Sequence, residues 1–317
     1  MPEPENEKCI RLKIDCPPKK DGGLKAVEDR QREKQDMMNR KYPKQKIIIK
    51  SGKIKKEHNI KDKIKCVTYH IYWNSETEGK IEKHIPKQIT EGFENKYQYI
   101  YHDKEGKEHE ICTVDWHKTK EKNIGKKYEA KPTHKKIISD KNVVEGQTRK
   151  RVLYENGDIA EYGSNNGKTF WVLYTANSSE IELVKMPDEL NYSNSINVKY
   201  DFSNTQRRYT SPGSLAGFIG ALAENNLKLT TTGSCFVSAS CFPSQEHVNG
   251  KSIDTLYLDN INEQKFIDAM HKFNFNKQIT GKDKKRFNNA TPEQRGTLHN
   301  SHLHSGFNES SIKEVKK

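Results

Sequence analysis

The chain has 317 residues, of which 32% are hydrophobic and 31% charged, and its formal net charge is +13. We predict no membrane span, because no apolar run approaches the roughly 20 residues that a membrane helix needs. The first residues also lack the apolar stretch of a conventional signal peptide. We therefore expect a protein that stays in the cytoplasm or leaves by a route that reads no such signal.

Positive charge gathers in the first half of the chain, where residues 1–150 hold 37 Lys and Arg against 25 Asp and Glu. The excess indicates an acidic partner such as a nucleic acid, an anionic cell envelope or an acidic protein, unless it is only a lysine-rich solvated surface. Six cysteines include no Cys-x-x-Cys pair, which disfavours a zinc ribbon or a thioredoxin-type site. Cys235 and Cys241 are spaced closely enough for a disulfide in an oxidising compartment, and equally suit two buried thiols.

The first two regions of the chain differ in their apolar pattern. Residues 1–60 are rich in Lys, Glu, Asp, Asn and Gln, which predicts a mostly flexible basic arm. Residues 61–190 predict a β-rich region of hairpins and a meander, in which Asn156-Gly157 and Asn166-Gly167 mark tight turns. Its strands are expected in 66–73, in 97–116 around a turn at 103–107, in 151–176 and in 181–186. We interpret this region as a targeting or delivery module.

Residues 191–317 predict a compact α+β domain with two helices and a small antiparallel sheet. The first helix has apolar residues at helical spacing, Ser211 as its N-cap and Pro212 in its first turn. The second helix has Asn262 as its predicted cap. Helices are expected within 211–229 and at 262–273, a strand at 252–258 and an extended segment at 297–307.

One acidic residue stands out because it lies inside a strand that otherwise reads as buried. Asp254 shares a strand face with Leu256 and Leu258, and an unpaired carboxylate in apolar surroundings is costly. His247 comes seven residues earlier, and Gly250 between them lets the backbone turn sharply. The spacing therefore favours a metal shared by the histidine and the acid.

The segment HNSHLH near the end of the chain holds three histidines in six residues. In an extended segment His302 and His304 point to the same side, and His299 precedes them by a short turn. Together His247, Asp254 and His304 would supply two nitrogens and one oxygen, the set that catalytic zinc prefers, with a fourth position left for water. A histidine beside the metal, such as His302, could then move protons or stabilise a developing oxyanion.

These two segments resemble the motifs of a known group of enzymes. EHVNGKSID is similar to the S-x-H-x-x-G-x-A-x-D motif of zinc peptidases that cut peptides of bacterial cell walls, and HNSHLH resembles the H-x-x-H-x-H motif of penicillin-insensitive murein endopeptidases. Lysostaphin-type enzymes, D-Ala-D-Ala carboxypeptidases and hedgehog domains belong to the same structural group. The resemblance covers about residues 200–310. It implies that His247, Asp254 and His304 bind Zn²⁺, that His302 is catalytic and that His299 assists it.

The chain departs from the family pattern at three places. Ser244 lies three residues ahead of His247 rather than two, and no arginine lies between Gly233 and His247 to bind a substrate carboxylate. The tryptophan and acid that carboxypeptidases carry just before their last histidines are replaced by Thr297 and Leu298. These differences favour an endopeptidase over a strict D,D-carboxypeptidase.

The resulting functional prediction is a zinc-dependent peptidoglycan peptidase whose substrate is a cell-wall peptide. One hypothesis makes it an exported antibacterial toxin that needs a specialised secretion machine and a cognate immunity protein, and acts in the periplasm or cell wall. A wall-binding module or a phage lysis enzyme are further hypotheses for the basic and β-rich half. A nucleic-acid-binding protein or metal-dependent nuclease is the main alternative, disfavoured because HNSHLH lacks a neighbouring Asp-His. A metal-binding but inactive domain is the third reading.

Overall fold

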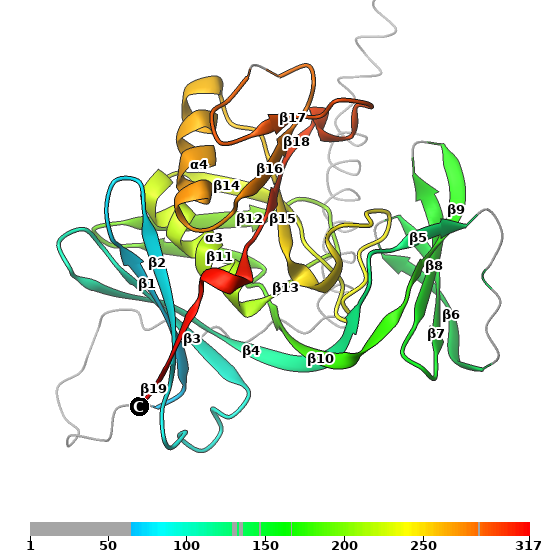
Figure 1. Cartoon of the computed structure of the whole chain (residues 1–317), viewed down its shortest axis with the longest axis horizontal. Coiled ribbons are helices and arrows are strands. Elements are labelled where there is room, and N and C mark those ends of the chain that lie inside the picture. The colour runs from blue at the N-terminus through cyan, green and yellow to red at the C-terminus, as the bar shows by residue number, and fades with distance from the viewer. Residues whose placement is uncertain (1–64, 129–131, 133–135, 146, 166, 285) are drawn as a thin grey trace, which may run out of the picture. The chain divides into compact units, whose positions relative to one another are not determined.

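The computed structural model describes residues 65–317 apart from 129–131, 133–135, 146, 166 and 285. The predicted flexible arm at 1–60 lies outside the described residues. Strands hold 48% of the described residues and helical segments 15%, and together they form three sheets and two α-helices (Figure 1). The α+β prediction is therefore wrong, because the described part of the chain is mostly β.

Sheet I has seven strands in the order β13-β10-β4-β3-β1-β2-β19. They are β1 (Val67–Trp73), β2 (Gly79–Ile85), β3 (Lys96–His102), β4 (Glu108–Lys122), β10 (Ala176–Lys185), β13 (Tyr209–Thr210) and β19 (Lys313–Lys316). The predicted hairpin of β3 and β4 is confirmed, since Asp103 accepts a hydrogen bond from the N–H of Lys107 at 2.9 Å across the turn. Strand β19 pairs in parallel with β2, so residues far apart in the sequence complete one sheet.

Sheet II has five strands in the order β5-β9-β8-β7-β6. They are β5 (Lys126–Tyr128), β6 (Ile137–Glu145), β7 (Thr148–Tyr154), β8 (Ile159–Asn165) and β9 (Lys168–Tyr174). The predicted turn at Asn156-Gly157 is confirmed, because Gly157 has a φ of +87° and its N–H donates to the carbonyl of Tyr154 at 2.9 Å. Strands β8 and β9 pair as far as the second predicted turn, whose Asn166 lies outside the described residues.

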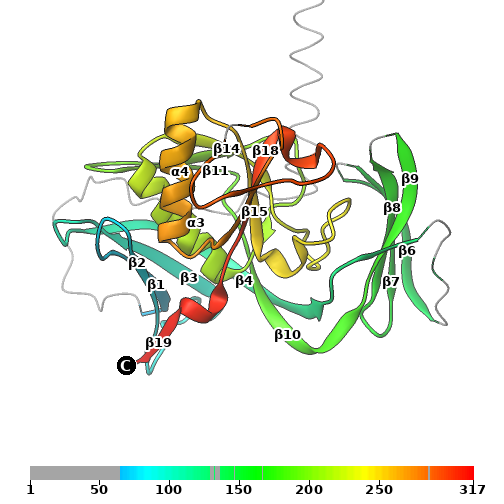
Figure 2. The same ribbon diagram turned by 45° about the horizontal axis from the view of Figure 1, so that its top comes forward.

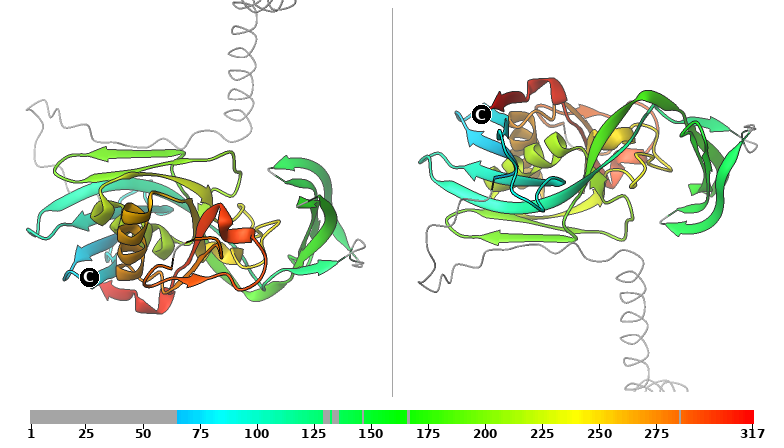
Figure 3. Two further views of the ribbon diagram at one scale, coloured as in Figure 1. Left: turned by 90° about the horizontal axis from the view of Figure 1, so that it is seen from above. Right: turned by 90° about the horizontal axis from the view of Figure 1, so that it is seen from below.

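The middle of the chain runs out to sheet II and back along one long ribbon. Strand β4 leads into sheet II, and β10 returns from it and pairs antiparallel with β4. Figures 1 and 3 show sheet II to one side of the helices, at the end of this ribbon. Sheet II is thus inserted in the sequence between two paired strands of sheet I, β4 and β10.

Sheet III has seven strands in the order β11-β12-β14-β15-β18-β16-β17. They are β11 (Glu189–Ser193), β12 (Asn197–Phe202), β14 (Lys228–Gly233), β15 (Ser252–Leu256), β16 (Lys277–Thr280), β17 (Thr291–Pro292) and β18 (His302–Gly306). The prediction of a small antiparallel sheet is wrong, because β12 pairs in parallel with β14 and β16 with β17. Short polar strands such as KLTTTG in β14 alternate in burial but not in polarity, so they carry no strand signal in the sequence.

Two α-helices, α3 (Pro212–Asn225) and α4 (Asn260–Lys272), lie beside each other (Figure 2). The predicted N-cap of α3 is confirmed: the Ser211 side chain accepts from the N–H of Ser214, and Pro212 follows it. Helix α4 begins earlier than predicted, because Asp259 rather than Asn262 is the cap and accepts from two N–H groups of the first turn. None of the helices in the described residues is long and apolar enough to cross a bilayer.

The main core lies where α3 packs between sheets I and III. Helix α3 contacts β1 of sheet I and β12 of sheet III, and nearly every residue of the helix is buried. Tyr69 and Ile71 of β1, Phe218 and Ile219 of α3 and Phe273 after α4 share one apolar cluster. Burial of this cluster fixes sheet III, which carries the candidate site, against the rest of the fold.

Candidate metal centre

Two neighbouring strands of sheet III place an acid and a histidine side by side. Asp254 on β15 lies directly opposite His304 on β18 in the antiparallel register, so both side chains leave the same face of the sheet. Residues Ser252 to Thr255 of β15 are all buried, and the strand lies inside the sheet between β14 and β18. The acid that stood out in the sequence therefore has an imidazole as its cross-strand partner.

A tight turn before β15 brings His247 back to the same place. The short 3-10 helix Val248–Gly250 follows His247, and the N–H of Gly250 donates to the carbonyl of His247 at 3.2 Å. Gly250 has a φ of +69°, and a Cβ there would lie 2.5 Å from the backbone nitrogen of Ser211. Only glycine suits this turn, as the sequence predicted.

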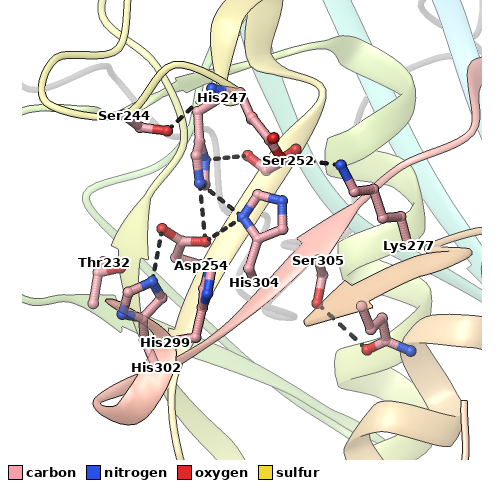
Figure 4. Close-up of polar contacts among 12 residues, drawn as sticks. Thr232, Ser244, His247, Ser252, Asp254, Lys277, His299, His302, His304 and Ser305 are labelled. Atoms are coloured by element: carbon pink, nitrogen blue, oxygen red, sulfur yellow. Dashed lines mark hydrogen bonds and ion pairs between the residues drawn. The ribbon is translucent and has the colours of Figure 1, made fainter. Parts of the chain in front are cut away.

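The three side chains meet at a shared point (Figure 4). The Nε2 of His247, the Oδ1 of Asp254 and the Nδ1 of His304 lie 3.0 Å from one another along each side of a triangle. Ligand atoms about 2.0–2.1 Å from one zinc ion lie roughly 3.3 Å apart, so this triangle suits a single cation. All three residues are at least 97% buried, and they form a group that could hold a metal ion.

The protonation of this group favours cation binding. Burial lowers the pKa of His247 to about 4, although the Asp254 carboxylate opposes the shift, so the imidazole is neutral at pH 7. The Nδ1–H of His247 donates to the carbonyl of Ser252 at 3.2 Å, which leaves Nε2 with a free lone pair. Burial works against ionisation of Asp254, but its contacts with His247 and His304 keep its pKa well below the usual value. The site therefore presents the neutral His247 imidazole and one carboxylate.

The other two predicted histidines lie beside the triangle rather than in it. The Nε2 of His302 is 3.5 Å from the Oδ2 of Asp254, and burial lowers the pKa of His302 below its ordinary value. The backbone N–H of His299 donates to the Glu293 carboxylate at 3.0 Å, and the His299 carbonyl accepts from the Tyr257 hydroxyl at 2.7 Å. Burial lowers the pKa of His299 as well. The ring centre of His299 lies 5.6 Å from that of His304, so both side chains lie next to the candidate metal ligands.

A cleft of about 690 Å³ opens onto this group. All five predicted site residues line it: His247, Asp254, His299, His302 and His304. Side chains of sheet II, including Lys127, line it as well, although no sequence motif connects the two regions. The structure therefore brings together every predicted site residue and adds a wall that the sequence analysis missed.

The sequence also does not predict a positively charged side chain, Arg207, beside the candidate metal ligands. The Nη2 of Arg207 lies 3.7 Å from the Oδ2 of Asp254 and donates to the carbonyl of Thr232 at 3.4 Å. Arg207 precedes α3 and is 47 positions from Asp254 in the sequence, so no local spacing connects them. The one sequence signal is Gly233, which has a φ of +98° and where a Cβ would lie 2.3 Å from the Arg207 carbonyl oxygen. Its lack of a side chain permits the close approach of the two segments.

No family model, no curated protein and no solved structure matches the chain. The function is therefore proposed from the side chains of the candidate metal centre and from the cleft that surrounds them.

Proposed function

We propose that this chain is a zinc-dependent peptidase that hydrolyses peptide bonds of bacterial peptidoglycan, as an endopeptidase rather than a strict D,D-carboxypeptidase. The buried triangle of His247, Asp254 and His304, open to a cleft, is the observation that carries the proposal. Two imidazoles and one carboxylate form the donor set of hydrolytic zinc sites. The similarity of the surrounding motifs to cell-wall peptidases supports the choice of substrate.

The side chains of the triangle would hold the ion through Nε2 of His247, Oδ1 of Asp254 and Nδ1 of His304. Zinc in such a site supplies Lewis-acid chemistry, activating water near neutral pH and polarising a carbonyl group. A single carboxylate among the ligands leaves the centre with a net positive charge, which favours this chemistry. Because His247 is neutral at pH 7, binding the ion there displaces no proton from it.

Three neighbouring side chains can assist the reaction. His302 is neutral at pH 7 and lies beside Asp254, where it can accept a proton and return it to a leaving amine. His299 faces the same cleft and can donate a hydrogen bond to substrate. Arg207 supplies a permanent positive charge that can stabilise negative charge developing on a substrate oxygen.

The remaining predictions concern where the enzyme acts. We infer that it is an exported antibacterial toxin, delivered by a specialised secretion machine to the periplasm or cell wall of a target cell. A producer would then need a cognate immunity protein. A metal-dependent nuclease is the alternative, since Arg207 and Lys127 place positive charge in the cleft.

Metal analysis of the purified full chain is the first test. We expect wild type to retain about one zinc ion per chain after dialysis. His247→Ala should lose the ion, because it removes one of three ligands from a buried site. His271→Ala is the matched control, since this histidine is exposed on α4 away from the triangle. Equal zinc content in all three proteins would contradict the assignment.

Digestion of purified sacculi, read by mass spectrometry of the released fragments, tests the activity. We expect wild type and His271→Ala to release peptide-cleaved fragments, and His247→Ala to release none. His302→Ala should keep zinc and lose activity by about 10²–10⁴-fold, the usual contribution of a positioned acid or base. Nicking of supercoiled plasmid without sacculus digestion would favour the nuclease instead.

A further inference from the structure

The cleft has two walls that come from different sheets. The candidate metal ligands and their neighbouring histidines belong to the wall built by sheet III. The opposite side includes Ile124, next to β5, together with Lys127, Gln147 and Asn165 of sheet II and its turns. A ligand that fills the cleft therefore touches both sheets.

Sheet II is fixed to the segment that carries His247 by several polar contacts. The Tyr174 hydroxyl donates to the carbonyl of Ser244 at 2.7 Å, and the N–H of Gly125 donates to the carbonyl of Gln245. The Gln245 side chain returns a hydrogen bond to the carbonyl of Gly125. These contacts lie within three residues of His247, so the position of sheet II is set relative to the metal centre.

Buried charge and apolar packing reinforce this attachment. The fully buried Glu161 carboxylate of β8 accepts from the Ser240 hydroxyl at 2.7 Å and from the N–H of Phe242 at 3.1 Å. Val172 and Tyr174 of β9 share an apolar cluster with Cys235, Cys241 and Phe242 of the same segment. The wall formed by sheet II is thus held to the segment that carries His247 by apolar packing as well as by hydrogen bonds.

A positive charge on the wall formed by sheet II favours an anionic group at that side of the cleft. The Nζ of Lys127 lies 5.1 Å from the centre of the Phe170 ring and has no carboxylate within 4.0 Å in the described part of the chain. Glu246 lines the cleft too, but it is paired with Lys277 at 3.0 Å. Among the described lining residues Lys127 therefore offers positive charge on the wall away from the metal centre.

The uncharged lining indicates what kind of molecule carries that negative charge. Amide side chains and hydroxyls, among them Gln147, Asn165 and Ser203, line the cleft together with six apolar residues. Such groups pair with the N–H and C=O groups of an extended peptide. A carboxylate is the anion that a peptide itself supplies, and a lysine binds it as a point charge.

We propose that sheet II is the substrate-recognition wall of the cleft and that Lys127 is a specificity-determining residue that binds a free carboxylate of the peptide, away from the bond that is cut. The identity of the peptide rests on the proposed peptidase function. Lys127 acts on substrate binding and takes no part in the chemical step. Its neighbour Lys126 does not line the cleft, because successive side chains of a strand point to opposite faces.

The test uses two synthetic stem peptides, L-Ala-γ-D-Glu-L-Lys-D-Ala with an amidated C-terminus and with the glutamate α-carboxyl either free or amidated. Binding of each to the full chain is measured by calorimetry, and cleavage of each by zinc-loaded protein is followed in parallel. Lys127→Met removes the charge and keeps the aliphatic stem over Phe170, and Lys126→Met is the matched control. We expect wild type and Lys126→Met to bind the free acid about two- to five-fold more tightly than the amide, and Lys127→Met to lose this preference.

The outcomes separate the two proposals. A preference for the free acid that survives in Lys127→Met overturns the recognition role while leaving the peptidase standing. A preference that depends on Lys127, without cleavage of sacculi or peptides, supports the recognition wall and rejects the peptidase. Absence of peptide binding, with Lys127-dependent binding of a single-stranded oligonucleotide, overturns both and favours the nucleic-acid alternative.

Discussion

Replacement of Glu161 tests whether sheet II holds the segment that carries His247 in place. This carboxylate has 0% side-chain exposure. It accepts a hydrogen bond from the Arg151 Nε–H at 2.7 Å in addition to its two contacts with the segment before His247. Glu161→Ala removes the acceptor that the Arg151 Nε–H, the Ser240 hydroxyl and the Phe242 N–H share. Glu161→Gln keeps the size and one acceptor oxygen but removes the charge.

The expected cost follows from the exposure of the partners. Removal of one member of a buried ion pair costs about 3–5 kcal/mol, and Arg151 is 16% exposed. Water can therefore solvate part of the guanidinium, and we expect Glu161→Ala to lower the free energy of unfolding by about 3 kcal/mol. Glu161→Gln should cost about 1.5 kcal/mol, the value of a hydrogen bond to a charged group.

Urea unfolding followed by tryptophan fluorescence measures these differences, with an unchanged slope as the check on two-state behaviour. Glu180→Gln on β10 is the control, because this glutamate is exposed, and it should leave the unfolding midpoint unaltered. We also expect weaker zinc binding by Glu161→Ala, since the segment that presents His247 loses an anchor. If Glu161→Ala were as stable as the control and bound zinc equally well, sheet II would not support the metal centre.

Three further predictions concern pH and packing. Burial raises the pKa of Glu263 to about 7, so ionisation of this carboxyl destabilises the fold as the pH rises from about 4.5 toward 7. In urea unfolding at pH 8, Glu263→Gln should therefore be more stable than wild type by about 2 kcal/mol. Burial and neighbouring histidines lower the pKa of His70 to about 4, so as the pH falls from 6.5 toward 4 the unfolded chain binds a proton before the folded chain does, and the free energy of unfolding decreases. His70→Gln should reduce this decrease by about 1 kcal/mol, a value that allows for solvent at a half-buried site. Gly220→Ala should destabilise the protein by about 2 kcal/mol despite its better helix propensity, because the new Cβ would lie 2.5 Å from the Phe273 ring.

Each of these has an outcome that would contradict it. Equal stability of Glu263→Gln and wild type at both pH 5 and pH 8 would mean that the carboxyl ionises normally in the fold. If His70→Gln has the same acid-unfolding midpoint as wild type, protonation of His70 does not contribute to acid unfolding. A higher melting temperature for Gly220→Ala would show that Phe273 moves aside without cost.

Local sequence signals are sufficient to predict turns and helix caps. The turn at Asn156-Gly157 and the cap at Ser211 were predicted correctly, because each depends on a few adjacent residues. The predicted N-cap of α4 is wrong, because Asp259 and Asn262 are both residue types that cap helices well. The sequence does not show which of the two side chains accepts from the N–H groups of the first turn. Fold class failed for a different reason, namely that short polar strands in sheet III are stabilised by their neighbours in the sheet and not by an apolar pattern.

The candidate site divides in the same way. His247, Asp254 and His304 could be proposed together because glycine, strand periodicity and histidine spacing each restrict where a side chain points. Arg207 and Lys127 could not, since they reach the cleft only through the packing of α3 and the path of the β4–β10 ribbon. Long-range contacts of this kind have no sequence spacing from which they could be recognised.

The cross-strand register of Asp254 and His304 makes the metal centre a check on strand alignment. Slippage of β18 by one position would turn His304 to the opposite face and leave the acid opposite a leucine or a serine, so misaligned conformers could not capture the ion. Zinc added during refolding would then trap only correctly aligned chains, and a chelator would let misaligned ones persist. Cation uptake would thus report the correct alignment of β18 with β15.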